Sequence, residues 1–171
     1  MADDITGAVR ILHIVAGVTL AGGAFLWTTV IMPTSAKLLP PPVRGAMVAA
    51  LFPRVSNYLA AASATAILSG AWLLGLIVGF DGVVPVVTST LYGAVLAVSL
   101  VAMLAALAIA VFAIRPMGFR LIALGKAATP GAPPPPEVPA LAKRVARLGL
   151  VNFAITISVV ALMALAVNLR T

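Results

Sequence analysis

Residues 86–114 read VVTSTLYGAVLAVSLVAMLAALAIAVFAI, a run without a single Asp, Glu, Lys or Arg. A helix needs about 20 predominantly apolar residues to cross the hydrocarbon core of a membrane, and this run exceeds that length. Three further runs meet the same requirement, so the four predicted spans cover residues 8–32, 55–79, 86–114 and 148–169. None of them alternates in polarity as a membrane β-strand would. The sequence therefore predicts an all-α integral membrane protein.

The composition of the whole chain supports this class. Of its 171 residues, 63% are hydrophobic and 9% are charged, whereas a soluble domain carries about 25% charged residues. So few charged side chains cannot cover a surface that faces water. Because no fixed repeat or second compositional zone divides the chain, we expect one transmembrane domain, residues 1–171, folded as a four-helix up-down bundle.

Prolines and a tight turn predict where the spans end. Pro33 is expected to end the first helix, Pro53 to precede the second, and Arg115-Pro116 to close the third, because proline breaks the helical hydrogen-bond ladder. Phe80-Asp81-Gly82 predicts the turn between the second and third spans. Residues 129–139, TPGAPPPPEVP, predict a polyproline II linker before the fourth span.

The basic residues predict the orientation of the chain. Nine of the eleven lie in the two segments that join span one to span two and span three to span four. They are Lys37, Arg44, Arg54, Arg115, Arg120, Lys126, Lys143, Arg144 and Arg147. The positive-inside rule makes both segments cytoplasmic and leaves both termini outside. The net charge of +7 thus reflects topology in a plasma membrane, and we expect no nucleic-acid partner.

The scarcity of reactive side chains excludes several kinds of site. The chain has no Cys, one His and four acidic residues, so sites of thiolate-bound metal and paired-carboxylate catalysis are not expected. An enzyme acting alone is not expected either. Asn57, Tyr58, Asn152 and Thr156 are interpreted as hydrogen-bonding groups between helices.

An ionisable group inside a span is a functional hypothesis by default, and the candidate here is His13, in the first span. The simpler alternative is that His13 donates one hydrogen bond to a neighbouring helix. Gly17, Ala21 and Ala24 share its predicted face, which points that face into the bundle. Small residues beneath the imidazole would let a flat ligand or another backbone approach closely.

Other polar or soft side chains are expected at the depth of His13 in the outer half of the bundle. Ser69, Trp72, Tyr92, Met163 and Asn168 have this place. An imidazole opposite a thioether is one way to hold haem iron and also suits copper, although Met163 is more simply explained by packing. Arg10, one turn before His13, would pair with a haem propionate or a lipid headgroup, or extend to the outer interface.

The first two spans resemble the CopD-like membrane proteins, a group that includes copper-resistance D domains and, more distantly, HemJ-type enzymes. The resemblance rests on Leu12-His13-Ile14-Val15-Ala16-Gly17, Gly22-Gly23-Ala24-Phe25 and Met32-Pro33 in the first span, and on Arg54 and Ser69-Gly70-Ala71-Trp72 in the second. It implies a four-helix unit that binds haem b or copper beside a respiratory system. His13 is the position that carries over as a ligand. Relatives often place a Lys and a His in the third helix, and this chain has neither there.

These observations lead to one principal hypothesis and two alternatives. The principal hypothesis is a small membrane subunit of a respiratory or redox complex that contacts haem or copper through His13, with Arg10, Tyr92, Trp72 and Met163 near the cofactor. The first alternative is a non-catalytic accessory or assembly subunit that packs against larger membrane proteins. The second is a transporter of copper or a small solute.

Overall fold

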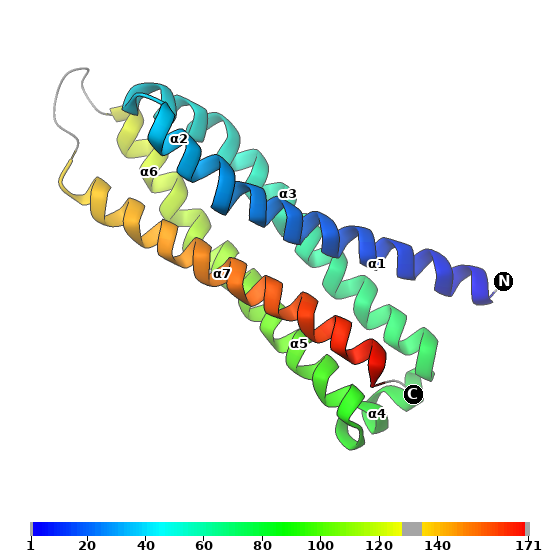
Figure 1. Ribbon diagram of the computed structural model, residues 1–171. Helices are drawn as coiled ribbons and strands as arrows, with labels where there is room; N and C mark the ends of the chain where they lie inside the picture. Colours follow the sequence, from blue (N-terminus) through cyan, green and yellow to red (C-terminus); the bar gives the residue numbers. More distant parts are fainter. Residues whose placement is uncertain (1, 128–134, 170–171) are drawn as a thin grey trace.

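The computed structural model describes residues 2–127 and 135–169, and every regular element in these two ranges is helical. Four helical stretches are long and apolar enough to cross a membrane: Asp3–Leu38, Pro41–Val78, Leu91–Ala127 and Glu137–Asn168. Figure 1 shows them lying lengthwise beside one another. The prediction of an all-helical chain with four such spans is confirmed.

The first long helix runs through Pro33 instead of ending there. It consists of α1 (Ala2–Phe25), the π-helix η1 (Leu26–Ile31) and α2 (Met32–Leu38). Within an α-helix the ring of Pro33 would clash with the carbonyl of Thr29, four residues earlier. A π turn is wider than an α turn, and η1 places one where it relieves this clash. The prediction that Pro33 ends the helix was therefore wrong.

The third long helix also continues through a proline that follows a π-helix. It consists of α5 (Leu91–Ala108), the π-helix η3 (Ile109–Ile114) and α6 (Arg115–Ala127), so Arg115-Pro116 does not close it. Its start also differs from the predicted span 86–114, because the short helix α4 (Val83–Ser89) ends before Thr90. Thr90 is extended, and its hydroxyl oxygen accepts a hydrogen bond of 2.9 Å from the backbone N–H of Gly93. This N-cap begins a new helix.

The second long helix, α3 (Pro41–Val78), includes Pro53 in its interior and so begins well before the predicted span. It ends at Gly79, whose φ of 78° lies in the region that favours glycine. The predicted turn at residues 80–82 is confirmed as the 3₁₀-helix η2 (Phe80–Gly82).

The fourth long helix, α7 (Glu137–Asn168), takes in residues that were predicted to be linker. Of the expected polyproline II segment 129–139, residues 137–139 form the first turn of α7. Proline fits the first turn of a helix because the N–H groups there have no partner inside the helix. Residues 128–134 lie outside the part of the chain that the structure describes.

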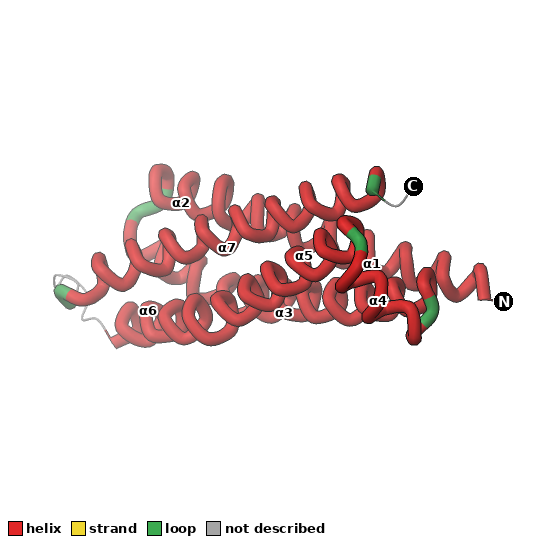
Figure 2. The backbone as a smooth tube through the Cα atoms, turned by 90° about the horizontal axis from the view of Figure 1, so that it is seen from below, coloured by secondary structure: helices red, strands yellow, loops and turns green. Residues whose placement is uncertain are grey.

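The helices associate mainly as two pairs, α1 with α3 and α5 with α7, as the two views of Figures 1 and 2 also show. Leu20, Ala62 and Met103 form a buried cluster between them. On α1 the buried positions are Ala16, Leu20 and Ala24, so the buried face is turned slightly from the predicted one, where Gly17 and Ala21 are only half-buried. Close packing through small residues is the usual basis of helix association in lipid.

Basic side chains collect at one end of the molecule, called the basic end below. There α2, α6 and the first turns of α3 and α7 come together, while the N-terminus, α4 and the last turn of α7 lie at the opposite end (Figure 1). The four long helices have 36, 38, 37 and 32 residues. At about 1.5 Å per residue they are longer than the hydrocarbon core, which is about 30 Å thick. The surplus length lies at the basic end, where the segments expected to be loops are helical.

Candidate functional site around His13

The imidazole of His13 is tied to α3 by its Nδ1 atom. Nδ1 lies 2.9 Å from the carbonyl oxygen of Ala66 and 3.3 Å from the hydroxyl oxygen of Ser69. A carbonyl oxygen can only accept a hydrogen bond, so Nδ1 carries the hydrogen and donates it. In the neutral ring the lone pair then belongs to Nε2.

The hydroxyl of Ser69 supports the same assignment. It donates to the carbonyl oxygens of Thr65 at 2.5 Å and Ala66 at 3.3 Å, within α3. Because its hydrogen is used there, its oxygen can only accept from Nδ1 of His13. Ser69 is buried and His13 is half-buried, and hydrogen bonds in such low-dielectric surroundings are stronger than in water.

A glycine of α3 makes room for the ring. A Cβ atom at Gly70 would lie 2.8 Å from Cε1 and 3.1 Å from Nδ1 of His13, closer than van der Waals contact allows. The close approach expected beneath His13 is therefore real, but Gly70 of the neighbouring helix provides it. Gly17 and Gly22 of α1 have no atom within 4 Å of a Cβ built on them.

Within the described ranges, the other residues predicted to lie near a cofactor make no hydrogen bond to His13. Tyr92 and Met163 are half-buried, Arg10 is exposed, and 58% of Trp72 is exposed. In the described part of the chain, both hydrogen bonds of His13 go to α3. The structure thus brings Ser69 to His13 and leaves Trp72 largely facing outward.

Met163 is level with His13 along the bundle but on a different helix pair. The rings of Phe25 and Phe153 are 6.0 Å apart, and α1 and α7 run in opposite directions from this contact. Counting outward on both helices brings Met163 and His13 to similar depths, about 15–18 Å from the ring pair at about 1.5 Å per residue. Similar depth does not by itself bring Met163 to His13, because the two residues belong to different helix pairs.

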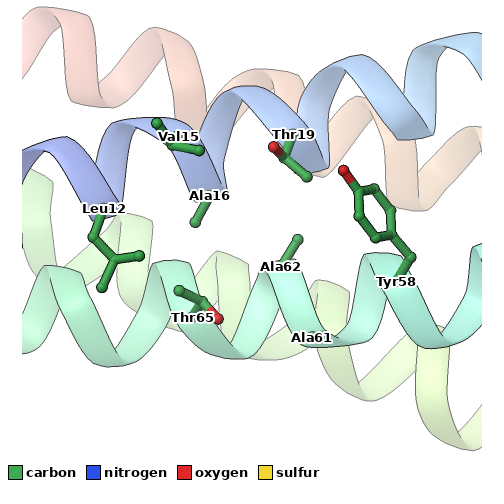
Figure 3. A pocket seen from close by; sticks show the side chains of 8 residues that line it. All are labelled: Leu12, Val15, Ala16, Thr19, Tyr58, Ala61, Ala62 and Thr65. Carbon is green, nitrogen blue, oxygen red and sulfur yellow. The ribbon is translucent and has the colours of Figure 1, made fainter.

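Beside His13, a shallow groove of about 260 Å³ runs along the outside of α1 and α3. Figure 3 shows the side chains that line it. They are Leu12, Val15, Ala16, Thr19, Tyr58, Ala61, Ala62 and Thr65. The lining is apolar apart from three hydroxyl groups, so the groove suits a hydrocarbon chain.

The polar residues predicted to join helices at other levels include Thr156, Asn152 and Tyr58. The hydroxyl of Thr156 donates to the carbonyl of Asn152 within the same helix, at 2.9 Å. The side-chain oxygen of Asn152 is buried and has no hydrogen-bond partner among the described residues, and Tyr58 is 59% exposed. The prediction of interhelical bonds was wrong for Thr156, because a Thr hydroxyl in a helix reaches its own i−4 carbonyl.

The donor set for a metal is small. Within residues 2–127 and 135–169, no three His, Cys, Asp or Glu side chains come together to form a metal site. Nε2 of His13 fits one coordination position of a haem iron or a copper ion. The remaining ligands would have to come from a thioether or from another chain.

Sequence reasoning found His13 and Ser69 but could not find the carbonyl of Ala66 or the role of Gly70. Both contributions depend on the register between α1 and α3, which no single-helix pattern encodes. Comparisons of the chain with family models, with curated proteins and with solved structures found no match.

Proposed function

We propose that this chain is a membrane subunit of a respiratory or redox complex, and that His13 supplies one imidazole ligand to a haem iron or copper ion shared with another chain. One observation carries the proposal: Nδ1 of His13 donates to the carbonyl of Ala66. Metal-binding histidines almost always donate their second ring N–H to a carbonyl, carboxylate or water, which fixes the tautomer and the ring orientation. Here that bond leaves the lone pair on Nε2.

The residues of α3 have a defined role in this proposal. The Ala66 carbonyl and the Ser69 hydroxyl hold the proton on Nδ1, and Gly70 leaves space for the ring. A bound haem or copper ion would supply one-electron transfer. The chain's contribution is to present one oriented nitrogen, and in this proposal a partner subunit completes the ligand set.

The proposal includes a topology. The four spans form an up-down bundle in the plasma membrane, with the basic end in the cytoplasm and both termini outside, as the positive-inside rule favours. His13 then lies in the outer half of the membrane. The resemblance of residues 12–33 and 69–72 to CopD-like proteins supports a haem or copper role at this depth.

The second candidate function is that of an accessory subunit without a cofactor, in which His13 only fastens α1 to α3. The contact with Gly70 favours it, because imidazole and glycine pack together with no space between them. In this candidate the exposed apolar faces of the helices pack against larger membrane proteins. The two candidates differ in whether Nε2 has a ligand.

A substitution that separates the two roles of the imidazole tests the proposal. In His13→Asn the side-chain amide nitrogen can replace Nδ1 as the donor to Ala66, but no atom replaces Nε2 as a ligand. We expect the complex purified from its own membranes in mild detergent to show a haem absorption band or bound copper. His13→Asn should lose it while the subunit remains in the complex. Metal or haem content unchanged in His13→Asn, or a colourless and metal-free complex that retains its partner subunits, would overturn the metal role.

A further inference from the structure

An apolar stripe follows one face of α5 and η3 on the outside of the molecule. Five side chains of this stripe line a shallow groove of about 320 Å³. They are Leu104, Leu107, Ala108, Val111 and Phe112. All belong to one long helix, and Phe112 is 80% exposed, so this face is open to whatever surrounds the protein.

A basic residue, Arg115, follows the apolar stripe on the same helix. Arg115 follows Phe112 by three residues and Phe119 follows Arg115 by four, the spacing of neighbours on one helix face. The Cζ atom of Arg115 lies 5.7 Å from the centroid of the Phe119 ring. Since α6 runs from Arg115 to the basic end, this contact draws the guanidinium away from the groove toward that end.

The ring of Phe119 packs against a second aromatic ring. The rings of Phe119 and Phe52 meet edge to face with their centroids 5.8 Å apart. Phe52 of α3 is 7% exposed, and its ring packs against Gly118 of α6. The guanidinium therefore lies over a ring that itself packs against the buried Phe52.

Arg115 stands at the boundary of the charge-free part of the bundle. The uncharged run 86–114 ends at this residue, and Arg54 and Arg147 end the corresponding runs of α3 and α7. An arginine at such a place extends its head to the headgroup level and keeps its stem in hydrocarbon. The stripe thus leads from the hydrocarbon core to the level of lipid phosphates.

The charge of this end favours an anion. Nine Lys and Arg side chains lie on the segments at or next to the basic end, against a single acidic side chain, Glu137. The carboxylate of Glu137 is paired with Arg120. In the described ranges no carboxylate pairs with Arg115, so its charge is available to a ligand.

We propose that this surface is a binding site for one anionic phospholipid. An acyl chain lies in the groove from Leu104 to Phe112, and the lipid phosphate is bound by the guanidinium of Arg115. The apolar lining, the exposure of Phe112, the stacked cation and the boundary position all match the two halves of such a molecule. A neutral phospholipid would make the acyl contact but would gain less from the surplus of positive charge.

Native mass spectrometry of the full chain in detergent, titrated with phosphatidylglycerol or phosphatidylcholine of the same acyl composition, tests this site. We expect the parent chain to bind at least one phosphatidylglycerol more tightly than phosphatidylcholine. Arg115→Gln should weaken phosphatidylglycerol binding about fivefold, since one cation near an anionic lipid contributes about that factor. The matched control is Arg147→Gln, which removes an equal charge at the same level of α7 and should change this affinity less than twofold.

A second variant tests the acyl half of the site. Phe112→Ala removes an exposed ring and should weaken binding of both lipids several-fold, whereas Leu68→Ala, at a 70% exposed position of α3, should not. Arg115→Lys keeps the charge and should retain most of the preference for phosphatidylglycerol. This variant distinguishes a loss of charge in Arg115→Gln from a folding defect at the same position. If Arg115→Gln and Arg147→Gln weaken phosphatidylglycerol binding equally, the preference for this lipid comes from the overall positive charge of the basic end. That result would overturn the site. A protein dimer that Phe112→Ala abolishes would assign the groove to a protein segment and overturn it as well.

Discussion

A side chain at Gly118 of α6 should clash with the ring of Phe52, which occupies the space above the glycine. A Cβ atom at Gly118 would lie 2.2 Å from Cζ and 2.4 Å from Cε1 of Phe52. Carbon atoms in contact are about 3.5–4.0 Å apart, so the ring would have to move by more than about 1 Å. It cannot do so freely, since Phe119 and Trp27 lie against it with ring centroids 5.8 and 6.4 Å away.

The size of the effect follows from two opposing terms. Overpacking of this kind costs about 1–3 kcal/mol, while replacing a glycine inside a helix by alanine contributes about 1 kcal/mol of stability. Gly149 of α7 is the matched control, because a Cβ atom there has no neighbour within 4 Å and only the second term applies. Gly118→Ala should therefore be about 1–3 kcal/mol less stable than Gly149→Ala.

Reversible unfolding in mixed micelles with increasing sodium dodecyl sulfate, followed by circular dichroism, measures this difference. In a Phe52→Ala background the clash is absent, so Gly118→Ala should then change stability by the same amount as Gly149→Ala. The double-mutant cycle isolates the contact between the two residues. If Gly118→Ala and Gly149→Ala shift the midpoint equally in the parent chain, the account of this contact is refuted.

Three further outcomes are expected. Gly70→Ala should displace the imidazole and cost the Nδ1 bond, about 0.6–1.7 kcal/mol between membrane helices; unfolding in the same micelles checks this, and the loss should vanish in a His13→Ala background. Cysteines introduced at Lys126 and Asp81 should react with membrane-impermeant reagents from opposite sides of the membrane, and labelling from one side would contradict the topology. Glu137→Gln removes an exposed ion pair and should lower the unfolding free energy by less than about 1 kcal/mol, whereas a larger loss would show that this pair holds α6 to α7.

The class of the fold could be predicted from the sequence because it depends on long-range averages. Long apolar runs predicted the four spans, and their length and composition do not depend on how the helices pack. The helix ends were predicted less well because they depend on local backbone geometry. Pro33 and Pro116 end no helix, since a π turn precedes each of them, and a π turn has no sequence signature comparable to the proline itself. Thr90 did carry a readable N-cap signal that the apolar run around it concealed.

The site was predicted in part, for a related reason. A lone imidazole inside a span is conspicuous in any sequence, so His13 could be singled out. Its partners come from α3, and two of them are a backbone carbonyl and a glycine, which no residue type announces. Trp72 and Met163 were assigned to the site from their depth alone. Depth along the membrane follows from residue counting, but the direction of a side chain around its helix follows from packing.

The proposed function requires that Nδ1 of His13 carries the hydrogen and that Nε2 is the nitrogen left for a ligand. Because the chain has one histidine, a protein labelled with ¹⁵N-histidine and purified without a histidine tag gives ring signals from His13 alone. We expect a directly bonded hydrogen on Nδ1 in the nitrogen spectrum of the metal-free protein in lipid, with Nε2 unprotonated. A neutral ring with its hydrogen on Nε2 would contradict it, since Nδ1 could then make no hydrogen bond to the carbonyl of Ala66.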